Sequence, residues 1–464
     1  MANPDTPSSS IPSVENVTRR TVLKGMAGVA GVASFSGFLA ACSGGASPAA
    51  SGGASAGASA AGSAAAGGSL TFGSNYSDAV PKKAMQDIVD AFTKETGITV
   101  KVNTVDHGTF QNQLNSYLQA TPDDVFTWFS GYRMRFFAAK GLATDVSDVW
   151  GKIGSNYSDA FKVGATGDDG KQYFVPIYNY PWAVFYRKSL FKDKGYNIPK
   201  TWADYKTLLA KMKSDGLVPL AFGDKDGWPA MGTFDIINLR KNGYQFHVDL
   251  MAGKQKWTDQ KVKDVFNLWK EILPFVQEGA AGRTWQDAAQ ALVKKQAGLY
   301  VLGMFVSDQF KTAGQTDLDD LDFFPFPDLG TEFDAEKALD APIDGFMIAS
   351  KSPNLSKDLD SAKAFLEYLG KGKTQIIFTT AAPGNIAAGK DAETSNYNAL
   401  QKKAVELISG AQKITQFLDR DTRPDFAGPN AMQAFLLNFL KDPNQDLDKF
   451  LKTIQDAWDA LPPQ

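Results

Sequence analysis

The sequence contains few of the residues from which metal and redox sites are built. Its 464 residues include one cysteine, Cys42, and two histidines, His107 and His247. A single thiol excludes a disulfide framework, so the fold must be stabilised by an ordinary buried core. Neither histidine has a cysteine or another histidine at metal-ligand spacing. We therefore expect no metal or other cofactor, and a structural or surface role for both histidines.

Simple absences also argue against several other functional classes. The net charge of −3 at pH 7 does not favour nucleic acid or an anionic membrane surface as a partner. Residues 370–374 look like a phosphate-binding loop, but Glu367 stands where that loop needs a glycine. The folded part of the chain has no Gly-x-Ser-x-Gly motif, which argues against a serine hydrolase.

The first 42 residues contain two sequence motifs. Arg19 and Arg20 precede an apolar run rich in glycine and alanine, which ends in two alanines and Cys42. The paired arginines resemble a twin-arginine export signal, and the end of the run resembles a bacterial lipoprotein cleavage site. The resemblance implies a signal peptide over 1–41 and a lipid on Cys42, which anchors the protein to the outer face of the cytoplasmic membrane. A transmembrane anchor is the alternative, but the run of about 17 residues is shorter than the roughly 20 that a spanning helix needs.

The residues after Cys42 predict a tether followed by two lobes. Residues 43–69 are almost entirely alanine, glycine and serine, so we expect 42–69 to behave as a flexible tether. The remaining chain of roughly 395 residues is too long for one typical hydrophobic core.

Apolar periodicity alternates between the strand and helix patterns. A short strand at 70–73, a helix that ends at Gly97 and an alternating strand at 98–102 predict a β-α-β unit. The pattern returns with a helix that begins after Thr201 and a strand at 217–222, and it becomes mainly helical after about residue 396. This alternation predicts an α/β fold with mostly parallel sheets, whose ligands bind at the carboxyl ends of the strands.

Short motifs along the chain carry a family resemblance, and their order is more specific than any one of them. They are 121–128 with a helix ending at 139–142, then 175–178, 185–191, 199–202, 223–229, 295–300, 324–327, 341–346 and 419–421. Together they resemble family 1 extracellular solute-binding proteins, the maltose-binding-like receptors of carbohydrate ABC importers. In one departure, Arg187 stands where the family usually has asparagine, at a position that is typically outside the ligand cleft.

The resemblance implies a periplasmic-binding-protein-like fold with two α/β lobes, a hinge of three crossings and a ligand cleft between the lobes. The first lobe would comprise 70–180 and 327–382, and the second 181–326 and 383–464 with a helical C-terminal region. The crossings would lie near 178–182, 325–327 and 381–383.

The implied function is capture of a mono- or oligosaccharide by hinge closure and its delivery to the permease subunits of an ABC transporter. Such a receptor is not an enzyme, and we expect a monomer outside the cytoplasm. Two alternatives stay open: a secreted glycosidase or lyase lipoprotein, which needs a pair of carboxylates across a cleft, and a receptor of the same fold for a non-sugar solute.

The residue types of a sugar site are also present at predicted strand ends and loops. A pyranose has apolar C–H faces and a ring of hydroxyls, so its receptor needs aromatic platforms with carboxylates, amides or guanidinium groups at the edge. Most aromatic residues of a two-lobed protein pack in the core, and a carboxylate beside a glycine is often a turn former. The candidate ligand-binding residues are Trp128, Tyr132, Tyr180, Trp182, Asp226, Trp228, Phe305, Asp344 and Arg420.

The two N-terminal motifs can be tested by substitution. Replacing Arg19 and Arg20 with lysine should block export, because a twin-arginine signal depends on the paired arginines. Cys42→Ser should release the protein or leave its precursor uncleaved, as cell fractionation and mass measurement would report. A cleaved Cys42→Ser protein that still fractionates with membrane lipid would contradict the lipoprotein interpretation.

Overall fold

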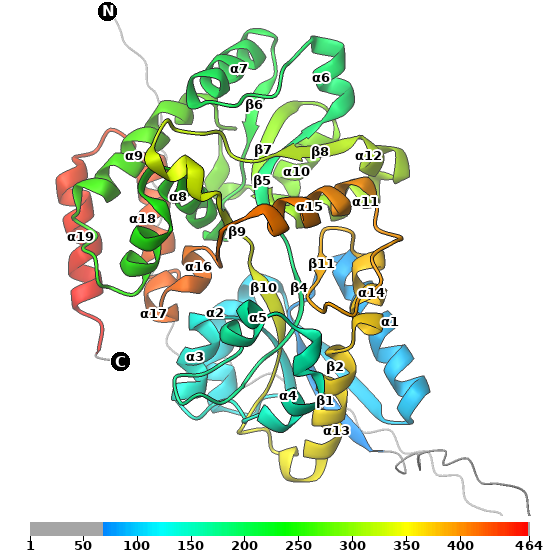
Figure 1. Cartoon of the computed structure of the whole chain (residues 1–464). Coiled ribbons are helices and arrows are strands. Elements are labelled where there is room, and N and C mark those ends of the chain that lie inside the picture. Colours follow the sequence, from blue (N-terminus) through cyan, green and yellow to red (C-terminus); the bar gives the residue numbers. More distant parts are fainter. Residues whose placement is uncertain (1–67, 463–464) are drawn as a thin grey trace, which may run out of the picture. The chain divides into compact units, whose positions relative to one another are not determined.

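The computed structural model of the protein describes residues 68–462 (Figure 1). Arg19, Arg20, Cys42 and nearly all of the expected tether over 42–69 lie outside the described residues, so those interpretations stay predictions.

One sheet has six strands in the order β11-β4-β10-β3-β1-β2. Its strands are β1 (Ser69–Ser74), β2 (Thr99–Thr104), β3 (Val125–Phe129), β4 (Val175–Asn179), β10 (Ile343–Ile348) and β11 (Ile386–Ala387). Strands β2 and β3 pair with β1 in parallel, whereas β10 runs antiparallel between β3 and β4. A strand from late in the chain therefore completes the middle of a sheet formed by much earlier segments.

The helices of this first lobe pack on that sheet and on one another. They are α1 (Ala79–Thr96), α2 (His107–Gln119), α3 (Tyr132–Ala139), α4 (Ser147–Ile153), η1 (Gly154–Asn156), α5 (Asp159–Gly164), α13 (Leu355–Leu369) and α14 (Gly372–Ala381). The predicted β-α-β unit is confirmed as β1, α1 and β2, with Gly97 in the left-handed conformation at the end of α1. Phe365 of α13 contacts the rings of Phe72 and Phe92, with centroids 5.8 and 4.9 Å away, so the returning helix joins the same core.

The other sheet has four strands in the order β6-β7-β5-β8. They are β5 (Trp182–Arg187), β6 (Val218–Ala221), β7 (Ala297–Gly303) and β8 (Leu321–Phe324). Strand β6 is parallel to β7, but β5 is antiparallel to both β7 and β8. Both sheets are thus mixed rather than mostly parallel, because β5 and β10 enter from the other lobe and run against their neighbours.

Many helices surround the four-stranded sheet. The longer ones are α7 (Trp202–Ser214), α8 (Trp228–Met251), α9 (Gln260–Ile272), α10 (Trp285–Val293), α15 (Ala399–Gly410), α18 (Met432–Lys441) and α19 (Leu447–Asp459). The shorter ones are α6 (Lys188–Lys194), α11 (Ser307–Ala313), α12 (Gln315–Asp320), α16 (Leu418–Asp421), α17 (Pro424–Ala427), η2 (Leu273–Phe275), η3 (Ala280–Gly282), η4 (Met304–Val306) and η5 (Glu332–Glu336). Thr201 caps α7 through a reciprocal capping box with Asp204, as the sequence predicts. Trp257 and Trp269 are fully buried among the aromatic side chains of this lobe.

The passages between the sheets differ in part from the expected crossings. The chain passes from β4 to β5 at 180–181, within the first expected range (Figure 1).

Residues 327–340 were expected in the first lobe, but they pack on α8 of the second lobe. Arg240 donates a hydrogen bond to the carbonyl of Ala338, and Thr331 donates one to the carbonyl of Arg240. Strand β9 (Ala338–Asp340) pairs there with β12 (Lys413–Thr415). The last passage follows β11 rather than 381–383, because β11 pairs with β4 in the first sheet.

Gly345 provides a test of how tightly β10 is held. A Cβ at this position would lie 2.1 Å from the carbonyl oxygen of Val175, which is a backbone atom in the same sheet. Gly345→Ala should therefore lower the free energy of unfolding by about 2 kcal/mol or more, measured by chemical denaturation. Gly410→Ala is the control, because its Cβ would meet nothing within 4 Å. Equal stabilities of the two variants would contradict the close packing of β10.

Candidate functional site

A cavity of about 320 Å³ lies between the two sheets. The first lobe lines it with residues that follow the carboxyl ends of its strands, such as Asn75 after β1, Phe129 at the end of β3 and Tyr180 after β4. The second lobe lines it from the start of β5, the start of α8, the start of α10 and the segment after β7. Of the nine predicted ligand-binding residues, the cavity brings together Trp128, Tyr180, Trp182, Trp228, Phe305, Asp344 and Arg420.

Aromatic side chains of the second lobe form one wall of the cavity. The ring of Trp228 meets those of Trp182 and Phe305 edge to face, with centroids 6.3 and 5.8 Å away. Trp285 meets Phe305 in the same way at 5.0 Å. Helix α8 approaches the ring of Trp182 so closely at Gly232 that a Cβ there would lie 2.2 Å from the ring. Rings held edge to face keep fixed orientations, as platforms for a flat ligand require.

Trp128 faces the cavity from the first lobe. Its ring stacks on Phe129 with centroids 4.7 Å apart, and the guanidinium carbon of Arg133 lies 5.6 Å from the ring centroid. The side chain is buried, yet its indole Nε1 has no hydrogen-bond partner within residues 68–462. Trp128 therefore packs in the core of its lobe and presents an unused donor.

A buried ion pair joins two of the three predicted charged residues, Asp344 and Arg420. Arg420 Nη1 donates a hydrogen bond to Asp344 Oδ1, and the guanidinium carbon lies 3.8 Å from the ring centroid of Phe129. Burial raises the pKa of Asp344, although Arg420 opposes that rise. Burial also acts to lower the pKa of Arg420, but Asp344 and nearby groups outweigh it and raise the pKa. The geometry thus pairs the two buried groups directly with each other.

Asp419 connects this site to the first lobe. Its carboxylate accepts hydrogen bonds from Arg133 Nη2 at 2.7 Å and from Gln111 Nε2 at 2.6 Å. Arg133 Nε also donates to the carbonyl oxygen of Asp419. The short helix α16 is therefore attached to α2 and α3 across the cavity edge.

Several cavity residues were not among the predicted ones. They include Asn75, Tyr76, His107, Phe129, Tyr178, Trp285, Gln286, Asp308, Asn385, Phe417 and Asp419. Trp285 begins a helix after a glycine-containing loop, as Trp228 does, and this pattern could have identified it. His107 was expected in a structural or surface role, but it lines the cavity, where burial lowers its pKa to about 4 and keeps the ring neutral.

Some buried polar atoms of the cavity residues have no partner in the described part of the chain. They are Nε1 of Trp128 and Trp182, Nε of Arg420, Oε1 of Gln286 and Oδ1 of Asp308. An unpaired buried polar group is costly, so a ligand with hydroxyl groups would be complementary to this mixture of donors and acceptors.

Two predicted ligand-binding residues, Tyr132 and Asp226, do not line the cavity. The neighbour of Tyr132 on α3, Arg133, binds Asp419 of the cavity lining, and consecutive helical residues point about 100° apart. The Tyr132 ring lies 5.8 Å from the guanidinium carbon of Arg135. Asp226 belongs to a turn before α8 in which Gly227 has φ 75°. Local geometry places both side chains outside the cavity lining: Tyr132 by helix periodicity and Asp226 by the turn beside Gly227.

Comparison with known proteins identifies the family. Residues 77–376 match the family of bacterial extracellular solute-binding proteins. The chain belongs to this family. Its members are solute-binding receptors rather than enzymes, and the family resemblance of the sequence is thereby confirmed.

Three relatives illustrate the similarity of this solute-binding protein to others. The solved structure of the bacterial solute receptor AcbH, which has an exclusive substrate preference for β-D-galactopyranose, is 45% identical, covers 84% of this chain and 98% of that one, and has a TM-score of 0.81. An ABC transporter extracellular-binding protein of Pyrococcus horikoshii is 25% identical over 82% of this chain and 86% of its own length. The α-glucosides-binding periplasmic protein AglE of Rhizobium meliloti is 26% identical over 80% and 82%. The two-lobed α/β fold with its cleft is thus confirmed.

Two structural features are absent from residues 68–462, a membrane-spanning helix and a cluster of metal-binding side chains. No helix in this range is both long and apolar enough to span a membrane. No group of three or more histidine, cysteine, aspartate or glutamate side chains there is arranged to hold a metal ion.

The buried carboxyl group of Asp308 predicts a pH-dependent stability. Burial raises its pKa to about 7, so folding favours the protonated form and stability falls as pH rises from about 4 to about 7. Asp308→Asn, which cannot ionise, should raise the free energy of unfolding at pH 8 by roughly 2 to 4 kcal/mol, and by less at pH 5. Chemical denaturation at the two pH values measures this difference.

The control for this experiment is Asp360→Asn, at an exposed position of α13. It should change stability by less than about 0.5 kcal/mol at either pH. A pH-independent effect of Asp308→Asn would contradict the burial argument.

Proposed function

We propose that this protein is a receptor for a single hexopyranose, with β-D-galactopyranose as the first candidate, and that it delivers the sugar to an ABC permease. The observation that carries the proposal is the cavity between the lobes, with its aromatic wall and its buried Asp344–Arg420 pair. Its volume of about 320 Å³ lies near the lower end of the roughly 300 to 1,000 Å³ usual for ligand sites, which favours one sugar ring over an oligosaccharide. The 45% identity to a galactose receptor supports the same choice.

Hinge closure is the proposed mechanism. The aromatic wall belongs to the second lobe, whereas Trp128 and Asp344 belong to the first, so each lobe holds an incomplete site. A ligand that touches both lobes stabilises the form in which they meet, by the difference between its contacts in the two forms. The permease then needs to recognise the closed form alone.

The binding free energy that a sugar receptor needs can come from the groups that line this cavity. Micromolar affinity needs about 8 kcal/mol, and a stacked aromatic ring contributes about 0.5 to 1.5 kcal/mol, so hydrogen bonds must supply much of the remainder. The same polar groups provide selectivity, because an epimer leaves one of them unpaired at a cost of about 1 to 3 kcal/mol.

The proposed receptor works outside the cytoplasm. Export through the twin-arginine signal and lipidation at Cys42 would place the receptor on the outer face of the cytoplasmic membrane, with residues 42–69 as the tether. We expect a monomer with no enzymatic activity.

Calorimetric titration with D-galactose, D-glucose and lactose tests the function. We expect D-galactose to bind at micromolar or better affinity, its epimer D-glucose to bind at least tenfold more weakly, and lactose to be excluded by the size of the cavity. Tight binding of lactose would point to an oligosaccharide receptor instead. Chromatography of the incubated sugars would detect cleavage products if the protein were a glycosidase, and binding of a peptide or polyamine alone would favour a non-sugar receptor.

A pair of tryptophan variants tests the location of the site. Trp228→Ala should weaken galactose binding by about 1 to 3 kcal/mol, because it removes a ring of the cavity wall. Trp257→Ala removes a tryptophan that packs on Phe234 and Phe426 outside the cavity. It should lower the free energy of unfolding by about 3 to 5 kcal/mol and leave the affinity of the folded protein unchanged. The reverse pattern would place the site elsewhere.

A further inference from the structure

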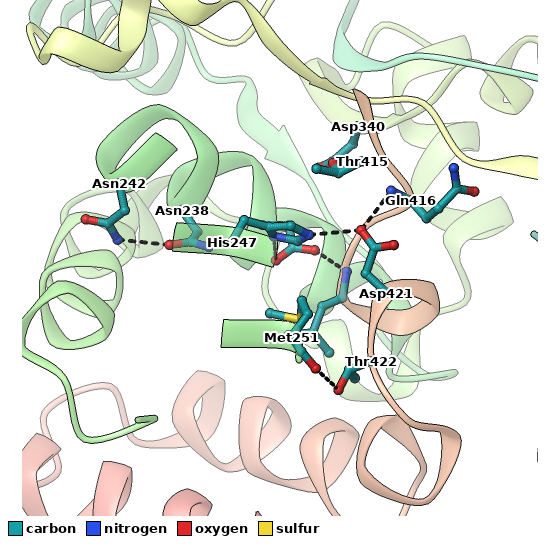
Figure 2. Close-up of polar contacts among 11 residues, drawn as sticks. Asn238, Asn242, His247, Met251, Asp340, Thr415, Gln416, Asp421 and Thr422 are labelled. Atoms are coloured by element: carbon teal, nitrogen blue, oxygen red, sulfur yellow. Dashed lines mark hydrogen bonds and ion pairs between the residues drawn. The ribbon is translucent and has the colours of Figure 1, made fainter. Parts of the chain in front are cut away.

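A buried histidine outside the cavity bridges two carboxylates (Figure 2). His247 of α8 is fully buried. Its Nε2 lies 3.0 Å from Asp421 Oδ2, and its Nδ1 lies 3.4 Å from Asp235 Oδ1. Asp235 precedes the break of α8 at Gly243 and Asp421 ends α16, so the ring joins three separate pieces of backbone. The cavity does not include His247.

The same carboxylates hold the backbone of residues 416–421. The amide of Gln416 donates to Asp421 Oδ2 at 2.9 Å, and the amide of Leu418 donates to Asp235 Oδ2. Between these two amides, Phe417 adopts φ 65°, a left-handed conformation that is unfavourable for a bulky side chain. Such a conformation persists only when neighbouring contacts impose it, and here the contacts come from the two carboxylates that flank His247.

This segment carries three side chains into the cavity. Phe417, Asp419 and Arg420 all line it, and Arg420 pairs with Asp344 of the first lobe. Gln416 also accepts a hydrogen bond from the amide of Ile343 at 2.8 Å, at the start of β10. The position of these groups therefore depends on how firmly 416–421 is attached to α8.

We propose that protonated His247 is a positioning residue, whose imidazolium holds Asp235 and Asp421 together and thereby fixes Phe417, Asp419 and Arg420 for ligand binding. The effect on sugar affinity rests on the proposed function, whereas the effect on the segment itself does not.

The charges around the ring determine the direction of the pH dependence. Asp235 and Asp421 face it directly, and the buried carboxyl of Asp340 on β9 lies nearby and accepts a hydrogen bond from Thr415. Asp340 acts to raise the pKa of Arg240, against the effect of burial, and Asp421 adds to the raised pKa of Tyr244. Burial alone would lower the pKa of His247, but Asp235 and Asp421 outweigh it and raise the pKa well above the usual 6.5.

Because the pKa of His247 is raised, the imidazolium that holds the two carboxylates is present at neutral pH and is lost as pH rises through the folded-state value. Burial and the charge of Asp235 raise the pKa of Asp340 to about 8, so ionisation of Asp340 adds negative charge to the cluster in the alkaline range. Loss of the histidine proton leaves Asp235 and Asp421 without the cation between them and weakens the attachment of 416–421, so sugar affinity should fall at alkaline pH.

Histidine NMR tests the protonation state directly. The chain has only two histidines, so ring-¹⁵N labelling yields two sets of signals, which a His107→Gln variant assigns. We expect His247 to be doubly protonated at pH 7 and His107 to be neutral. Saturating D-galactose should raise the apparent pKa of His247, because a proton that favours ligand binding must in turn be favoured by the ligand. A neutral His247 at pH 7, or a pKa that saturating ligand leaves unchanged, would overturn the proposal.

Hydrogen exchange tests the attachment without any ligand. In His247→Gln the amides of Gln416 and Leu418 should exchange at least tenfold faster than in the wild type. The matched control is Asn242→Ser on the same helix, because buried Asn242 donates its hydrogen bonds to Asn238 and to the carbonyl of Lys261 rather than to 416–421 (Figure 2). Unchanged exchange in His247→Gln, or equal acceleration in both variants, would refute the positioning role even if galactose proved not to be the ligand.

If His247→Gln fails to fold, the wild-type NMR titration still decides the protonation state. The milder Asp421→Asn variant then tests the attachment, since it keeps an oxygen that can accept from Gln416 but removes the charge opposite the ring.

Discussion

The structure depends on the pairing of buried charges that no single segment of the chain could satisfy alone. Asp344 on β10 and Arg420 on α16 are both buried, and each would be strongly unfavourable there without the other. Their pairing requires β10 to enter the first sheet and α16 to reach across from the second lobe. Asp419, the residue before Arg420, forms a second ion pair with Arg133 of the first lobe, and both of its partners are buried as well. The two lobes thus meet at paired charges as well as at apolar surface.

This arrangement explains why the cavity suits a polar ligand with a flat apolar face. The charged residues at the meeting of the lobes are occupied with one another but keep unused hydrogen-bonding atoms, such as Nε of Arg420. Aromatic rings that meet edge to face around Trp228 supply a rigid apolar wall beside them. Residues 416–421 belong both to the cavity wall and to the contact between the lobes.

The sequence predicted individual elements well and their long-range combination less well. The β1-α1-β2 unit, the capping of α7 by Thr201 and half of the aromatic residues that line the cavity followed from local patterns and the family resemblance. The side chains of Tyr132 and Asp226 lie outside the cavity lining, because a one-position shift around a helix or a turn beside a glycine redirects a side chain. Trp285 was missed although it begins a helix after a glycine-containing loop, as Trp228 does, and its ring contacts Trp228 and Phe305 in the cavity wall.

By itself the sequence determined the class of this protein: alternating apolar periods require α/β lobes, and ordered motifs across the chain indicate a solute-binding receptor. Only the tertiary structure decided which groups form the cavity and which charges are buried. The pairing of Asp344 with Arg420, and the place of His247 between Asp235 and Asp421, join positions far apart in the chain. Such contacts leave no local periodicity to detect, because they arise only when separate segments exclude water from the same small volume.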